Sequence, residues 1–98
     1  MKPSKALVIK EVDNVATAVQ QIKAGETICI DNENKVMTVL MLDDIAFGHK
    51  FAICDIVKNG PVVKYGETIG VATKEIRTGN HVHIHNVESC RCRGDKNK

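Results

Sequence analysis

The stretch that decides the fold is Ile76-Arg77-Thr78-Gly79-Asn80-His81-Val82-His83-Ile84-His85-Asn86. It opens with an apolar-x-x-Gly-x-x-apolar pattern that occurs four times in the chain, at Ile22…Gly25…Ile28, Ile45…Gly48…Phe51, Val57…Gly60…Val63 and Ile76…Gly79…Val82. Glycine in this position indicates a tight turn with positive φ, and the apolar residues on either side anchor the turn to a core. Four such turns predict short strands that run in several directions, as in a compact, mainly β domain.

The second half of the stretch alternates histidine with valine or isoleucine. It holds three of the four histidines of the protein, His81, His83 and His85. Side chains at i, i+2 and i+4 of a strand share one face, so the alternation predicts a strand over His81–Asn86 with an imidazole face. Two such histidines can reach one metal ion, but three in a row span too far for a single ion. A complete metal site therefore needs a residue from elsewhere; the alternative is an edge strand with solvent-facing histidines.

The fourth histidine lies in the second glycine turn, in Gly48-His49-Lys50. His49 is the candidate to complete a metal site. Backbone N–H groups and two cationic side chains in one turn also suit a carboxylate, so His49 and Lys50 are predicted to contact an acidic substrate. The alternative is a solvated turn.

The four cysteines give weaker signals. Cys90-Arg91-Cys92 is a poor zinc motif, because structural zinc sites use paired C-x-x-C knuckles, but it could join the histidines in a mixed site. Cys29 and Cys54 stand in apolar strands and are predicted to be small core residues.

One helix is expected in the first third of the chain. Asp13-Asn14 suits an N-cap, Val15, Val19 and Ile22 repeat at i, i+4 and i+7, and Gly25 follows where a C-cap belongs. This pattern predicts a helix of about two to three turns between the two caps.

A hairpin is expected next, with strands over Thr27–Ile30 and Val36–Leu42. The second strand is almost continuously apolar, which predicts burial on both faces, in the core or under a partner chain. A homo-oligomer is one arrangement that this strand would allow. Asp43-Asp44 is expected to end it and not to form a carboxylate dyad, because neighbours on a strand point to opposite faces.

Composition narrows the class of protein. The 98 residues suit one domain, the formal net charge is only +2, and one Tyr, two Phe and no Trp leave no stacking platform for nucleic acid. The basic residues of the tail are expected to be solvated. Neither a signal peptide nor an apolar run of membrane-spanning length is present, so we expect a cytoplasmic protein with no membrane partner and with reduced thiols.

Three segments together resemble a known family: Gly48–Ile53, Val63–Gly70 and Gly79–Ser89. They are similar to the small SAF domain of the altronate/galactarate dehydratases, a family that includes the sulfolactate sulfo-lyase small subunit. Asp13–Ala16 and Ile22–Glu26 resemble the first helix and turn of that domain. The resemblance covers nearly the whole chain.

The resemblance implies a β-clip fold, with one SAF domain over residues 1–90 and a flexible basic tail over 91–98. It also implies a lyase reaction, in which water leaves a sugar acid to give a 2-keto-3-deoxy acid, with a divalent metal, Fe²⁺ or alternatively Mn²⁺ or Zn²⁺. Since the sequence stops at Lys98, we expect a small subunit that works with a separate large catalytic subunit.

The implied site combines the two histidine segments. His83 and His85 are expected to act as catalytic residues and metal ligands, with His81 as a further ligand. His49, Lys50 and Asn86 are expected to bind the substrate. The alternative is a non-catalytic SAF module that binds a sugar acid or a metal ion.

Overall fold

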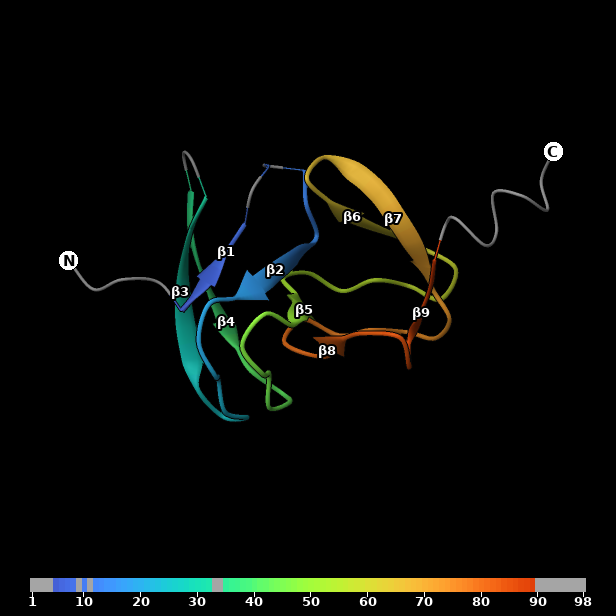
Figure 1. The fold of residues 1–98 in the computed structure, drawn as a ribbon. Coiled ribbons are helices and arrows are strands. Elements are labelled where there is room, and N and C mark those ends of the chain that lie inside the picture. Colours follow the sequence, from blue (N-terminus) through green and yellow to red (C-terminus); the bar gives the residue numbers. More distant parts are fainter. Residues whose placement is uncertain (1–4, 9, 11, 33–34, 90–98) are drawn as a thin grey trace, which may run out of the picture.

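The computed structural model describes residues 5–8, 10, 12–32 and 35–89, and within them it contains nine strands and no helix (Figure 1). The strands are β1 (Ala6–Leu7), β2 (Val15–Ala18), β3 (Thr27–Asn32), β4 (Lys35–Leu40), β5 (Lys50–Ala52), β6 (Pro61–Lys64), β7 (Glu67–Ala72), β8 (His81–Val82) and β9 (Val87–Ser89). They form three small antiparallel sheets in the orders β1-β2-β5-β8, β3-β4 and β6-β7-β9. The predicted mainly β, β-clip architecture is confirmed.

The predicted helix is wrong, because its first residues form β2. This strand is paired on one side with β1 and on the other with β5. Val15 packs in one core cluster and Ile22 in the other, while Val19 is exposed, so the three residues do not share a face. Small and β-branched side chains allow β2 to be buried on both sides, and pairing with two neighbours overrides a weak helical pattern.

Asp13 and Asn14 cap no helix and instead hold the β6–β7 hairpin. The buried Asp13 carboxylate accepts hydrogen bonds from the backbone N–H groups of Tyr65 at 3.1 Å and Gly66 at 2.8 Å. The Asn14 amide makes two hydrogen bonds of 2.8 Å with the backbone of β6. Two residues predicted to start a helix therefore join segments about fifty positions apart in sequence.

The predicted turns are confirmed in three places, where glycine has a φ of 86° to 93°: Gly25, Gly48 and Gly79. At the remaining turn the positive φ of 71° belongs to Asn59 and not to Gly60. The anchor there is Ile56, which is 3% exposed, whereas Val57 is 66% exposed. The repeated unit is therefore isoleucine, two residues, then glycine or asparagine, and the predicted frame of the third turn was off by one residue.

The four turns associate in two pairs. Ile22 and Ile45 exchange backbone hydrogen bonds of 2.9 and 2.8 Å, and Ile56 and Ile76 exchange two of 2.8 Å. The second and fourth turns lead directly into β5 and β8, which pair antiparallel with Lys50 opposite Val82 and Phe51 opposite His81. This pairing brings two segments about thirty residues apart in sequence to the middle of the molecule (Figure 1).

The predicted hairpin is confirmed as β3–β4, but the core does not bury both faces of its second strand. Burial of the second face under a partner chain stays a prediction. Val39 and Met41 face the core, whereas Val36 is 68% and Leu40 is 55% exposed. A two-stranded sheet lies on the core with one face only, so the strand alternates in burial despite its continuous apolar sequence.

The predicted burial of two cysteines is also wrong. Cys29 stands on the outer face of β3 and Cys54 follows the end of β5, and both are exposed. Among the described residues no helix is long and apolar enough to cross a membrane.

Candidate functional site

The histidine-rich segment is a turn and not the predicted six-residue strand. Only His81 and Val82 belong to β8, residues 83–86 turn, and β9 starts at Val87. Asn86 closes the turn: its Oδ1 accepts a hydrogen bond from the His83 N–H at 3.0 Å, and its Nδ2 donates one to the His81 carbonyl at 2.7 Å. The predicted strand with all three imidazoles on one face is therefore absent. Contacts with other parts of the chain determine where the imidazoles lie.

Three imidazoles meet where β5 pairs with β8, and we call His49, His81 and His83 the histidine cluster. His49 Nδ1 lies 2.9 Å from His81 Nε2, a hydrogen bond whose donor depends on the tautomers. The ring centroids of His49 and His83 are 4.7 Å apart, and those of His81 and His83 are 5.4 Å apart. One ring nitrogen from each residue lies within 4.8 Å of the other two.

His85 stands beside the histidine cluster. Its ring centroid is 5.3 Å from that of His81, with the planes tilted by 33°, and its side chain is exposed. The nitrogens that converge are those of His49, His81 and His83, and His85 is not among them. Of the four histidines that the sequence offers as metal ligands, the geometry thus brings together His49, His81 and His83 and leaves out His85.

The histidine cluster fits a divalent metal ion. The three nitrogens lie within 4.8 Å of one another and the rings are stacked, so the side chains would have to rotate to bring the nitrogens to the spacing of about 3.3 Å between two ligands of a tetrahedral zinc ion. Burial lowers the pKa of His81, and the positive charges that His49, His85 and His83 can carry lower it further, against a small opposing effect of Asp43. His81 is thus held in the neutral form that binds metal, and three imidazoles leave a coordination position open, as in catalytic sites.

Asp43 positions the histidine cluster from a neighbouring loop. Its Oδ2 accepts hydrogen bonds from the His81 N–H at 2.8 Å and from Asn80 Nδ2 at 3.1 Å. Asp44 points elsewhere and accepts from the Ala24 N–H at 2.8 Å, so the two carboxylates act separately. Sequence reasoning missed this role of Asp43, because only the tertiary structure brings residue 43 beside residue 81.

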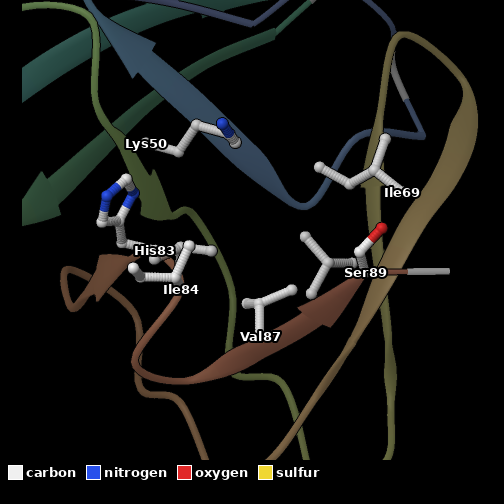
Figure 2. A pocket seen from close by; sticks show the side chains of 8 residues that line it. Lys50, Ile69, His83, Ile84, Val87 and Ser89 are labelled. Atoms are coloured by element: carbon white, nitrogen blue, oxygen red, sulfur yellow. The ribbon is translucent and has the colours of Figure 1, made fainter. Parts of the chain in front are cut away.

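Lys50 lines an apolar hollow of about 270 Å³ beside His83 (Figure 2). Its walls are largely valine and isoleucine from β6 to β9, and we call it the apolar hollow. Burial lowers the pKa of the Lys50 ammonium, and the charge of Lys64 lowers it further. His49 stacks on His81 and does not line this hollow. That His49 and Lys50 contact the same substrate carboxylate stays a prediction.

A second hollow, of about 340 Å³, is lined by His81 and not by His83, and we call it the polar hollow. Its lining includes Asp43, Glu75, His81 and His85. The buried Asn86 also borders it, with its amide bonded to the backbone on both sides. A substrate contact by Asn86 stays a prediction, and the geometry supports a positioning role. Cys90 and Cys92, the candidates for a mixed cysteine and histidine site, lie outside the described residues.

Replacing Asn86 by alanine tests this positioning role. The change leaves the His83 N–H and the His81 carbonyl without their partner, so we expect a loss of about 2 kcal/mol in the free energy of unfolding. We also expect about tenfold weaker metal binding, as for other groups that orient ligands. Urea denaturation and calorimetric metal titration measure the two effects. Asn86→Asp keeps the acceptor and should lose less stability; unchanged stability of Asn86→Ala with only a raised KM would instead make Asn86 a substrate contact.

The chain is similar in sequence to two altronate dehydratases. The chain is 43% identical over 81 residues to altronate dehydratase of Escherichia coli and 37% identical over 81 residues to altronate dehydratase of Bacillus subtilis. Each alignment covers 83% of this chain but only 16% of the relative, so the chain spans about a sixth of these enzymes.

A shorter relative matches over almost its whole length. The chain is 32% identical over 88 residues to (2R)-sulfolactate sulfo-lyase subunit alpha of Chromohalobacter salexigens, and the alignment covers 86% of this chain and 94% of that subunit. Residues 4–90 match the family described as the altronate/galactarate dehydratase SAF domain. Since this match covers nearly the whole chain, the protein belongs to the altronate/galactarate dehydratase SAF domain family.

Proposed function

We propose that the chain is the small subunit of a metal-dependent lyase that eliminates water from a sugar acid to give a 2-keto-3-deoxy acid. The observation that carries the proposal is the convergence of His49, His81 and His83, with one nitrogen from each residue within 4.8 Å of the others. The relatives support it: two are named altronate dehydratase, and one of similar length is named subunit alpha of a lyase.

The histidine cluster would hold the metal ion, which we propose to be Fe²⁺, with Mn²⁺ or Zn²⁺ as alternatives. When bound, such an ion supplies a Lewis acid that stabilises negative charge on an oxygen atom of the substrate. Two of the three histidines are held through their backbone: Asp43 accepts a hydrogen bond from the N–H of His81, and Asn86 accepts one from the N–H of His83. Loss of either bond would change where the ring nitrogens point.

The polar hollow is the side on which we propose that the substrate lies. The hydroxyl groups of a sugar acid need hydrogen-bond partners, and this hollow is lined by carboxylates, amides and imidazoles. His85 is exposed there and can give a proton to a leaving hydroxyl group, which is the general acid role. His83 faces the other hollow, so its proposed contribution is that of a ligand and not of a proton donor.

The elimination also needs a base for the α-proton and cations for the substrate carboxylate. The polar hollow offers Lys74 as a cation, but its carboxylates are those of Asp43, which bonds two N–H groups, and Glu75. We propose that a separate large lyase subunit supplies the remaining groups of the reaction site.

Co-expression with the large lyase chain of the same genome tests this function. We expect the purified complex to contain a divalent metal and to dehydrate altronate or galactarate, or to release sulfite from sulfolactate. His85→Ala should lower kcat about 100-fold or more while metal content is retained, as expected for loss of a general acid. A complex that forms but turns over none of these acids would contradict a lyase and favour the non-catalytic binding module; unchanged kcat in His85→Ala would remove His85 from the mechanism.

A further inference from the structure

The apolar hollow beside His83 is a built feature of the fold that the proposed reaction does not use. Its floor consists of Val62 from β6 and Val82 from β8, which are fully buried. Figure 2 shows Lys50, His83 and Ile84 on one side of the opening and Ile69, Val87 and Ser89 on the other. On the rim, Ile84 is 84% exposed and Ile69 is half-buried. Exposed isoleucine around a concave apolar surface is typical of a place where another molecule binds.

The charge of the apolar hollow is positive. The Lys50 side chain is half-buried in the wall, and among the described residues it has no carboxylate partner. The nearby charge that acts on Lys50 is another cation, Lys64. A partly desolvated ammonium group beside a second one gains from a carboxylate, so the complementary occupant is aliphatic and carries negative charge.

Two candidate occupants do not have this chemistry. A sugar acid would leave its hydroxyl groups against valine and isoleucine without hydrogen-bond partners, which is unfavourable. The last nine residues of the chain, Cys90 to Lys98, follow Ser89 directly, but they include four cationic side chains, one acidic side chain and no aliphatic one. An acidic, aliphatic segment of another protein chain has the complementary chemistry.

We propose that the apolar hollow binds an acidic, aliphatic segment of the large lyase chain, with an aliphatic side chain between Ile69 and Ile84 and a carboxylate at Lys50. This rests on the proposed function, since it takes the large chain as the partner. The interface would then lie against His83, so docking would cover one side of the histidine cluster and leave the polar hollow for the substrate. The metal ligands of one chain and the remaining catalytic groups of the other would meet at this boundary.

Association with the purified large chain, measured by calorimetry, tests the proposal. Ile69→Glu and Ile84→Glu place a charge on the apolar rim, and Lys50→Glu reverses the charge of the wall. Each should weaken binding roughly 30-fold or more, as for residues at the centre of an interface. Val57→Glu and Lys58→Glu are the matched controls, because Val57 and Lys58 are exposed, lie outside the apolar hollow and undergo the same changes. The controls should stay within about twofold of the wild type.

The outcomes separate the two proposals. If the wild-type chain binds the large chain and the three hollow variants bind equally well, the docking site is overturned and the proposed function stands. If the hollow variants instead change the oligomeric state of the isolated chain, the occupant is a second copy, which also overturns it. If the wild-type chain neither binds the large chain nor supports turnover, the proposed function itself falls. Ile69→Glu should bind Zn²⁺ like the wild type, since residue 69 lies on β7, away from the three ligands.

Discussion

Replacing His81 by alanine is expected to lower the affinity of the chain for Zn²⁺ or Mn²⁺ by about 100-fold or more. Loss of a group that merely orients a ligand already costs about 10- to 100-fold in affinity. His81 is the central member of the histidine cluster: its Nε2 lies 2.9 Å from His49 Nδ1, its ring stacks on that of His83, and its pKa is lowered chiefly by burial, which keeps it neutral. Calorimetric titration at pH 7.5 measures the effect, with circular dichroism to show that the variant is folded.

His85→Ala is the matched control for His81→Ala. The two residues belong to the same segment, but only His81 contributes a nitrogen to the converging group. We therefore expect the metal affinity of His85→Ala to stay within about threefold of the wild type, since His85 is neither one of the converging residues nor a residue that orients one of them. Equal losses in the two variants would mean that the ligands are those of the alternating sequence pattern and not those that the tertiary structure brings together.

Replacing Gly79 by alanine is expected to reduce the free energy of unfolding by about 3–5 kcal/mol. Gly79 has a φ of +93°, and an added Cβ would lie 2.2 Å from the Leu40 carbonyl oxygen and 3.1 Å from the Leu42 nitrogen. Both contacts are with backbone, which cannot rotate away. The shift would also strain the hydrogen bond of 3.0 Å from the Leu42 N–H to the Gly79 carbonyl.

Gly25→Ala separates the two causes of this loss. Gly25 has almost the same φ, +92°, but no atom lies within 4 Å of an added Cβ. Gly25→Ala should therefore reduce the free energy of unfolding only by the cost of the left-handed backbone, about 1–2 kcal/mol. Urea denaturation of both variants measures the difference. Similar losses at the two positions would show that the fourth turn can move away from Leu40, and would contradict the tight contact at this point.

The glycine turns are the part of the fold that the sequence predicts best. Gly25, Gly48 and Gly79 were recognisable because a positive φ restricts a position almost to glycine whatever surrounds it. The third turn was placed one residue off, since asparagine also tolerates this conformation and Asn59 uses it beside a glycine. The i, i+4, i+7 spacing of Val15, Val19 and Ile22 predicts a helix, and only the pairing of β2 with β1 and β5 makes Val15–Ala18 a strand.

At the candidate site, too, the sequence predicts the residue types, whereas the tertiary structure decides which of them meet. The residue types predict that histidines form the centre of the candidate site. The reach of imidazole side chains along a strand predicts that His49 must join them from another turn. The sequence by itself determined the turns, the strand-rich composition and the chemistry available, because these depend on local conformational limits and on side-chain identity. Only the tertiary structure decided which imidazoles converge. The pairing of β5 with β8 places His49 against His81, and the Asn86 hydrogen bonds turn the chain so that His83 joins them and His85 does not. Contacts between segments so distant in sequence leave no periodic signal in the chain.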